Sequence, residues 1–265
     1  MRGMDLELAG DTAVVTASTS GLGYGVARAF ATEDANVVLN GRDEDRLASA
    51  RADLEALGTG TVAAAAADVT DPDAVTDPVA VAADRFGTVD HLVTSSGGVP
   101  SGGFETLSDA EWQAAFEELV LSVVRLVRAA IPYLTDGGGT ITALTSRSVK
   151  EPHESMVLSS AVRPCVAGLV KTLSRELAPA VRANVVLPGP HETAGLEAHV
   201  TEGVERGAYE SYEAGLAELT ADVPLGRAGD PEEFGNLVAV LCSDRAGYVT
   251  GEALLVEGGS THSML

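Results

Sequence analysis

Apolar and polar residues alternate along this chain in two different rhythms. Short runs of four to six β-branched or other apolar residues are separated by longer stretches in which apolar residues recur at helical spacing. The short runs predict buried strands, and the longer stretches predict amphipathic helices. The predicted strands are Thr12–Thr16, Asn36–Asn40, Thr61–Ala66, His91–Thr94, Thr140–Thr145, Ala183–Leu187 and Ala253–Val256. The predicted helices are Gly23–Glu33, Asp43–Leu57, Pro72–Phe86, Asp109–Leu134, Ser155–Ala178 and Pro231–Cys242.

Strands and helices that alternate in this way are typical of βαβ units. We therefore expect an α/β fold of the Rossmann type, with a doubly wound, mainly parallel seven-stranded sheet and helices on both faces. No repeat, linker or change in composition divides the sequence, so residues 1–265 are expected to form a single domain. Residues 190–223 contain no predicted strand, and an insertion of this length is typical of a substrate loop or lid. Pro78 is expected to kink or split the third helix.

The charge of the chain is strongly negative. Thirty-nine acidic residues against 17 basic ones give a formal net charge of −22, and the acidic residues are scattered along the sequence. Such a surface repels nucleic acids and anionic membranes, so we expect neither as a partner. Adaptation to concentrated salt, which screens charge repulsion, is our hypothesis for this composition. An ordinary acidic bacterial enzyme is the alternative.

The sequence also limits where in the cell the protein is expected to be and which metal or disulfide chemistry it can have. No apolar run is long enough to cross a membrane, and Met1–Gly10 lacks the pattern of a secretory signal. Cys165 and Cys242 lie in apolar stretches, which predicts buried free thiols in a reducing compartment and favours a cytoplasmic location. The five histidines and two cysteines do not have metal-ligand spacing, so no metal site is expected.

A glycine-rich turn follows the first predicted strand. Residues 16–23 read Thr-Ala-Ser-Thr-Ser-Gly-Leu-Gly and lead directly into a helix. A turn of this kind lets backbone N–H groups and a helix N-terminus approach a diphosphate. The candidate dinucleotide-binding residues of this turn are Thr16, Ser18, Ser20, Gly21, Leu22 and Gly23.

This turn resembles the Thr-Gly-x-x-x-Gly-x-Gly fingerprint of the short-chain dehydrogenase/reductase family, with Ala17 at the first glycine. Further segments resemble the family in the same order over nearly the whole chain, and the likeness extends to members similar to 3-oxoacyl-(acyl carrier protein) reductases. The resemblance implies a nicotinamide dinucleotide cofactor. The further cofactor-binding residues that it implies are Asp68 and Val69 beside the adenine, then Ser95, Ser96 and Gly97, and at the nicotinamide end Pro188, Gly189 and Thr193.

The end of the second predicted strand bears on the choice of cofactor. The chain there reads Leu-Asn-Gly-Arg over residues 39–42, without the acidic residue that binds the ribose hydroxyls of NAD. Arg42 can pair with the 2′-phosphate of NADP, so the sequence favours NADP(H) over NAD(H). Asp43 and Glu44 follow at once, and Arg42 is also a reasonable first residue for a solvated helix, so NAD(H) stays open.

The family's usual catalytic residues are an asparagine, a serine, a tyrosine and a lysine, and only the serine is retained, as Ser146. The other three positions carry Leu119, Ser159 and Arg163. Ser159 and Arg163 are four residues apart on one helix face, so Arg163 can still hold the ribose. However, arginine does not release a proton as lysine does, and serine is a poorer acid than a phenol. The alternatives for the proton are a water molecule and His153, which lies in the loop between Ser146 and Ser159 and is otherwise an ordinary loop histidine.

Two functions remain open at this point. The first is an NAD(P)(H)-dependent oxidoreductase that interconverts a carbonyl and an alcohol of a small-molecule substrate, with a non-standard catalytic set. The second is a catalytically impaired dinucleotide-binding protein that acts as a sensor or scaffold. The family resemblance also implies a homodimer or homotetramer, and the apolar run Leu119–Val127 is compatible with such an interface or with the core.

Overall fold

The computed structural model describes residues 5–154 and 156–263. Seven strands form one sheet in the order β3-β2-β1-β4-β5-β6-β7, and every neighbouring pair is parallel. The strands are β1 (Thr12–Val15), β2 (Asn36–Gly41), β3 (Val62–Ala66), β4 (His91–Thr94), β5 (Gly139–Leu144), β6 (Val181–Pro188) and β7 (Ala253–Val256). The predicted α/β fold, with a doubly wound parallel sheet, is therefore confirmed.

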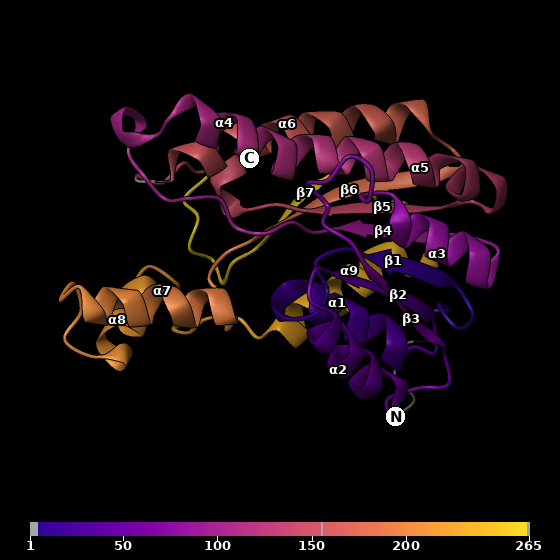
Figure 1. Cartoon of the computed structure of the whole chain (residues 1–265), viewed down its shortest axis with the longest axis horizontal. Coiled ribbons are helices and arrows are strands. Elements are labelled where there is room, and N and C mark those ends of the chain that lie inside the picture. Colours follow the sequence, from indigo (N-terminus) through magenta and orange to yellow (C-terminus); the bar gives the residue numbers. More distant parts are fainter. Residues whose placement is uncertain (1–4, 155, 264–265) are drawn as a thin grey trace.

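Helices cover both faces of this sheet (Figure 1). The helices are α1 (Gly21–Thr32), α2 (Glu44–Glu55), α3 (Asp77–Phe86), α4 (Asp109–Phe116), α5 (Ser122–Gly137), α6 (Val157–Glu176), α7 (Ala194–Glu205), α8 (Tyr212–Leu219) and α9 (Pro231–Cys242). One buried cluster joins α3, α4, α5 and α6 to one face of the sheet, and a second joins α1, α2 and α9 to the other. The two clusters are the two layers of core that a sheet covered on both faces requires.

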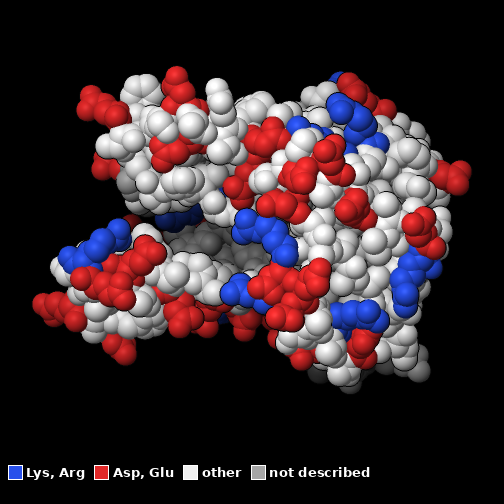
Figure 2. Space-filling view, in the orientation of Figure 1, with Lys and Arg blue, Asp and Glu red and all other residues white. Residues whose placement is uncertain are grey.

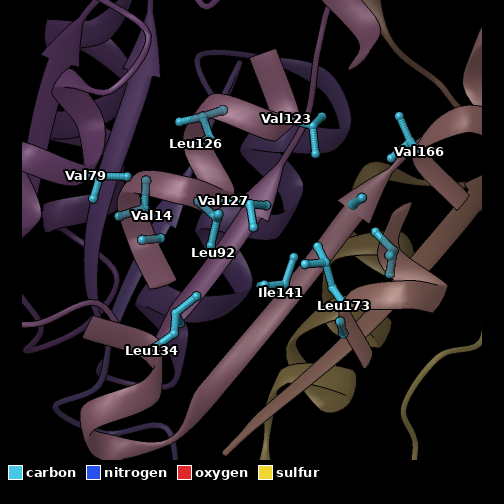
Figure 3. Packing of buried hydrophobic residues seen from close by; sticks show 14 of the residues in the cluster. Val14, Val79, Leu92, Val123, Leu126, Val127, Leu134, Ile141, Val166 and Leu173 are labelled. Atoms are coloured by element: carbon cyan, nitrogen blue, oxygen red, sulfur yellow. The ribbon is translucent and has the colours of Figure 1, made fainter. Parts of the chain in front are cut away.

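Aliphatic side chains of different elements interlock in the first of these clusters (Figure 3). Val14 of β1 and Leu92 of β4 are wholly buried against Leu126 and Leu134 of α5. Ile141 of β5 continues the same layer toward α6. These strands are buried on both faces, and even the polar residues of β5, Thr140 and Thr142, are buried.

The direction of chain winding reverses between β1 and β4. The chain runs outward from β1 to β2 and β3, and then returns to place β4 on the other side of β1. Connections on the two sides of this point leave in opposite directions, so a crevice opens at the carboxyl ends of the strands there. Ligands of open α/β sheets bind at such a switch point.

Several boundaries differ from those predicted. Helix α3 begins at Asp77 and not at Pro72, so Pro78 lies in its first turn, where proline needs no N–H partner, and the predicted kink or split does not occur. The predicted helix over residues 109–134 is interrupted by a π-helical turn, Glu117–Leu121. Ser155, where the fifth predicted helix begins, lies outside the described residues. Cys165 is exposed, so the prediction that both thiols are buried is wrong for this residue, which lies on the solvent side of α6.

The predicted lid over residues 190–223 forms two helices, α7 and α8, which project from the body of the molecule as an arm (Figure 1). The ring of Tyr209 lies between Gly203 and Gly215 so closely that a Cβ on either glycine would collide with it. This packing holds the two helices together. The arm begins at Thr193, whose side-chain oxygen accepts a hydrogen bond from the Leu196 amide and caps α7.

Candidate active site

A crevice of about 470 Å³ lies at the carboxyl ends of the strands, on both sides of the switch point. It receives residues from the ends of six of the seven strands, β1 to β6. Its volume falls within the range of small-molecule and cofactor sites. The lining residues predicted from the sequence are Ser20, Gly21, Leu22, Gly23, Arg42, Asp68, Val69, Ser95, Ser96, Gly97, Arg163, Pro188 and Thr193.

The glycine turn brings backbone donors close to the crevice. Gly21 has a φ of 58°, in the left-handed region that favours glycine, and a Cβ on Gly23 would collide with the Ala17 carbonyl oxygen. Helix α1 begins here, and the Ser20 side chain forms no cap hydrogen bond. The first amides of α1 are therefore available to an anion such as a diphosphate.

Two predicted cofactor residues of this turn lie behind the crevice. The Thr16 hydroxyl donates to the Ser95 carbonyl at 2.6 Å and accepts from the Ser95 amide at 2.8 Å. The Ser18 hydroxyl donates to the Val15 carbonyl at 2.7 Å and accepts from the Asn40 amide at 3.0 Å. Both side chains are fully buried and absent from the crevice lining. Their hydrogen bonds hold the turn against β4 and β2.

The end of the crevice beside β2 carries two arginines. Arg42 and Arg46 both line it, and Arg42 lies 3.7 Å from a carboxylate oxygen of Asp68. Asp43 caps α2, because its side chain accepts from the Arg46 amide at 3.0 Å. The Asp68 side chain accepts from the Thr70 amide and hydroxyl, and these bonds hold the pKa of Asp68 below its ordinary value.

The opposite end of the crevice lies between β4, β5 and β6. Ser95, Ser96, Pro188 and Thr193 line it as predicted from the family resemblance. Gly189 does not, because its amide donates to the Val256 carbonyl at 2.9 Å and a Cβ there would collide with Glu257. Gly189 therefore joins β6 to β7 behind the crevice.

Arg163 projects from α6 into this end of the crevice. Its guanidinium donates three hydrogen bonds, from Nε to Ser159 Oγ at 3.1 Å, from Nη1 to the Thr145 carbonyl at 3.2 Å and from Nη2 to the Gly97 carbonyl at 3.4 Å. All three acceptors are neutral, and burial lowers the pKa of the Arg163 guanidinium. The buried Ser159 hydroxyl lies 2.9 Å from that of Ser148, so Ser148, Ser159 and Arg163 form one hydrogen-bonded chain.

Of the four predicted catalytic residues, only Arg163 lines the crevice, whereas Ser146, His153 and the buried Ser159 stand apart from its lining. Ser146 lies just beyond β5, and its hydroxyl accepts from the Ser148 amide at 3.2 Å. It is thus next to the hydrogen-bonded chain, two residues from Ser148. His153 is exposed, and its Nδ1 lies 2.6 Å from the Glu154 carbonyl oxygen.

One buried hydroxyl at this end has no protein partner. Thr145 lines the crevice and is 8% exposed, and its Oγ1 forms no hydrogen bond. A buried hydroxyl without a partner is uncommon, and one that lines a crevice is available to a ligand. Together with the free amides of α1, it fits a polar ligand that extends along the crevice.

Glu118 also lines the crevice, and the sequence did not point to it. It belongs to the π-helical turn before α5, while the neighbouring Leu119 is buried in the core. Burial raises the pKa of Glu118, whereas the positive charges of Arg163 and Arg42 act against this shift. The one signal in the sequence was an acidic pair, Glu117 and Glu118, directly before an apolar run.

The described residues provide neither a metal site nor a membrane-spanning helix. Within residues 5–154 and 156–263, no group of three or more His, Cys, Asp or Glu side chains is placed to hold a metal ion. In the same part of the chain, no helix is both long and apolar enough to span a membrane.

Comparisons with known proteins identify the family. The family model described as enoyl-(acyl carrier protein) reductase matches residues 16–261. An uncharacterized oxidoreductase of Methylorubrum extorquens is 33% identical over 254 residues, which cover 96% of this chain and 98% of that protein. The chain belongs to the short-chain dehydrogenase/reductase family.

Solved structures of similar proteins include two complexes of the same fold. The L-sorbose reductase of Gluconobacter frateurii, complexed with NADPH and L-sorbose, has a TM-score of 0.94 and 30% identity, with 98% of this chain and 100% of that one covered. A 7α-hydroxysteroid dehydrogenase complexed with NADH and a 7-oxo bile acid conjugate has a TM-score of 0.85 and 26% identity, with 98% of each chain covered. Both proteins are named for reactions at an alcohol or carbonyl group, and one is complexed with NADPH and the other with NADH.

Proposed function

We propose that this protein is an NADP(H)-dependent oxidoreductase that interconverts a carbonyl and an alcohol of a small molecule with a non-standard catalytic set. The observation that carries the proposal is the single crevice that joins the free amides of α1 at one end to Arg163 at the other. A bound nicotinamide dinucleotide would supply the hydride acceptor or donor.

The preference for NADP(H) rests on the residues beside β2. Arg42 and Arg46 line the crevice there, and guanidinium groups suit the 2′-phosphate of NADP. Asp43 also lines the crevice, and its charge opposes that phosphate, but its side chain is held as the cap of α2. Glu44 lines a different hollow, between α2 and β3. The NADPH complex of the similar L-sorbose reductase supports the same choice.

The residues near the nicotinamide end of the crevice have different proposed roles in the reaction. Ser146 donates a hydrogen bond to the substrate carbonyl. Ser159 handles the proton, and the charge of Arg163 beside its oxygen stabilises negative charge there. Ser148 orients the Ser159 hydroxyl from the other side. His153 is an alternative proton donor only if the loop after β5 brings it inward, because its side chain is exposed.

Mixing the purified protein in molar salt with NADPH or NADH and a panel of ketones and ketoacyl thioesters tests the proposal. Loss of the absorbance of the reduced nicotinamide shows hydride transfer. Cofactor binding without transfer across the whole panel supports the sensor or scaffold function instead. If neither dinucleotide binds at millimolar concentration, the proposal is wrong.

Variants with matched controls test the catalytic role of each residue. Ser159→Ala is expected to lower kcat by roughly 10²-fold or more, since positioned proton transfer contributes on that order. Ser160→Ala is the control, because it makes the same change one residue along α6, where the Ser160 hydroxyl has no hydrogen-bond partner. Ser146→Ala, Arg163→Ala and His153→Ala complete the set. Equal activity of Ser159→Ala and Ser160→Ala would remove Ser159 from the mechanism.

We also propose a homodimer or homotetramer. Most of the apolar run Leu119–Val127 faces the core, so it is not the main support for an interface. Support comes from β7, an edge strand that is half-buried along its whole length, and from the fully exposed Tyr248 just before it. A symmetric contact over this edge would cover both.

A further inference from the structure

A carboxylate lies in the wall of a crevice that suits a polyanionic ligand. Glu118 lines the crevice together with the glycine turn and Arg163. A dinucleotide carries at least two negative charges on its diphosphate, and NADP carries further charge on its 2′-phosphate. Glu118 therefore opposes the binding of the ligand that the crevice otherwise favours.

Local structure fixes Glu118 in this position. The π-helical turn Glu117–Leu121 buries Leu119 in the core, and Glu118 is left on the crevice side. The Gly97 amide donates a hydrogen bond to the carboxylate. Gly97 has no side chain to obstruct this contact, and a Cβ there would lie 2.5 Å from Glu118 Oε1.

Gly97 connects Glu118 to Arg163. The Gly97 amide bonds to Glu118, and the Gly97 carbonyl accepts from Arg163 Nη2 at 3.4 Å. Among the charges that act on Arg163, that of Glu118 opposes the effect of burial. The two side chains thus form a charge pair across one glycine, in which Glu118 is the counter-charge of a guanidinium whose direct acceptors are neutral.

The other charged groups that face Glu118 come from two further elements. Arg42, just beyond β2, favours the ionised form of Glu118, and Asp68, just beyond β3, disfavours it. Arg125 of α5 is paired with Glu117 and not with Glu118. Arg163 is therefore the main cation that supports the Glu118 charge, and any anion that takes Arg163 weakens that support.

We propose that Glu118 competes with the dinucleotide for Arg163 and thereby sets the affinity and the pH dependence of cofactor binding. This inference rests on the proposed function, because it assumes that the crevice binds a nicotinamide dinucleotide. In the free protein Glu118 balances Arg163. When the cofactor binds, its negative charge replaces that of Glu118 as the partner of the Arg163 charge, while Arg163 keeps its hydrogen bond to Ser159. Glu118 then binds a proton or remains as an uncompensated charge in the wall.

Two measurable consequences follow. Glu118→Gln keeps the shape and the hydrogen bond from Gly97 but removes the charge, so it is expected to bind NADPH and NADH roughly five- to tenfold more tightly at low salt. In the wild type, affinity falls as the pH rises through the pKa of Glu118, because the ionised form repels the cofactor. In Glu118→Gln this part of the pH dependence is lost.

Glu117→Gln is the matched control. It removes the same charge from the adjacent residue of the same π-helical turn, but Glu117 is paired with Arg125 and does not line the crevice. Dissociation constants of NADPH and NADH are measured for the three proteins from about pH 5 to about pH 8 at constant ionic strength. NADH lacks the 2′-phosphate, which titrates in the same range, so its profile isolates the protein groups.

Calorimetry of the wild type in buffers of different ionisation enthalpy gives a second measurement that needs no variant. Proton uptake on binding NADH is expected in the wild type and in Glu117→Gln, and smaller uptake is expected in Glu118→Gln. Equal or weaker cofactor binding by Glu118→Gln, with an unchanged pH profile, overturns the inference while leaving the proposed function intact. If no protein of the set binds either dinucleotide, the proposed function itself fails.

Discussion

Arg163 makes a set of hydrogen bonds that a lysine at the same position could not reproduce. Its planar guanidinium donates to Ser159, Thr145 and Gly97 at once, and thus links α6, β5 and the loop after β4. A lysine ammonium is a compact charge with a shorter reach and no fixed planar geometry. The side chain thus supports the walls of the crevice as well as lining it.

Ala17 stands where the family fingerprint has a glycine, and this difference affects the stability of the turn. Its φ of 47° lies in the left-handed region, which costs a residue with a Cβ about 1 kcal/mol relative to glycine. Ala17→Gly is therefore expected to stabilise the protein by roughly 0.5–1 kcal/mol, less than the full strain because glycine also gains freedom in the unfolded chain. Urea unfolding measures the difference.

Ala52→Gly is the control for this change. Ala52 is exposed inside α2, so the same substitution there is expected to destabilise by about 1 kcal/mol. If Ala17→Gly destabilises to a similar degree, the turn at residue 17 is not strained.

The residues of the site differ in how far the sequence could predict them. Arg163 and Ser159 were placed correctly beside each other because helical spacing fixes which residues share a face. Glu118 was missed because a π-helical turn shifts the register by one residue, and periodicity assumes an unbroken helix. Thr16 and Ser18 lie in the predicted turn, but only packing shows that their hydroxyls face inward.

At the scale of elements, the start of α9 shows how one carboxylate serves several partners. Glu233 accepts from the Asp230 amide at 3.0 Å, which completes a capping box. It also binds Arg227 through two hydrogen bonds of 2.8 and 2.6 Å. These contacts, that with Arg227 first, lower the pKa of Glu233 from 4.5 to about 2. The carboxylate therefore connects the segment after the arm to the helix that covers β5 and β6.

Glu233→Gln keeps an oxygen that can accept from the Asp230 amide but loses the ionic hydrogen bonds to Arg227, so it is expected to lower the Tm at neutral pH by about 2–4 °C. Because the folded pKa is depressed, the contribution of Glu233 is complete above pH 4.5 and is lost as the pH falls toward about 2. The difference between the variant and the wild type should therefore shrink below pH 4.5. Thermal unfolding across this range measures it.

Glu202→Gln, an exposed change within α7, supplies the baseline for losing one negative charge. A Tm difference for Glu233→Gln that does not vary with pH, or that matches that of Glu202→Gln, would contradict the stabilising role of the ionised Glu233 carboxylate.

Elements with strong local signals were predicted well. Asp230 and Pro231 mark the start of α9, and Ser108 with Glu111 marks that of α4, because each signal is a hydrogen bond made within one turn. The arm was predicted only as an insertion. Its two helices depend on Tyr209 packing between Gly203 of α7 and Gly215 of α8, and no helical or strand periodicity records a contact between two helices.

At the scale of the whole molecule, the distribution of charge separates the outer surface from the crevice. On the face shown in Figure 2, acidic side chains are spread over the arm and the body, while several basic side chains border the hollow between them. The basic residues that line the crevice are Arg42, Arg46 and Arg163. A net charge of −22 thus coexists with a locally positive path for an anionic cofactor.

The same charge makes the whole molecule sensitive to salt. Self-repulsion acts on the folded state most strongly, because folding brings the acidic groups closer together, and salt screens it over a distance of about 10 Å at 0.1 M and about 3 Å at 1 M. We therefore expect the Tm to rise by at least about 5 °C between dilute buffer and 2 M KCl, which corresponds to roughly 1–3 kcal/mol for a chain of this size.

A variant with fewer charges separates this screening from the general effect of salt on apolar surface. Replacing four exposed glutamates by glutamine, Glu105, Glu202, Glu205 and Glu218, removes four negative charges without touching the crevice. Its Tm is expected to depend less steeply on KCl than that of the wild type, because less repulsion remains to be screened, whereas a purely apolar effect would leave the two slopes equal. A wild type that is equally stable in dilute buffer would favour the ordinary acidic enzyme over adaptation to salt.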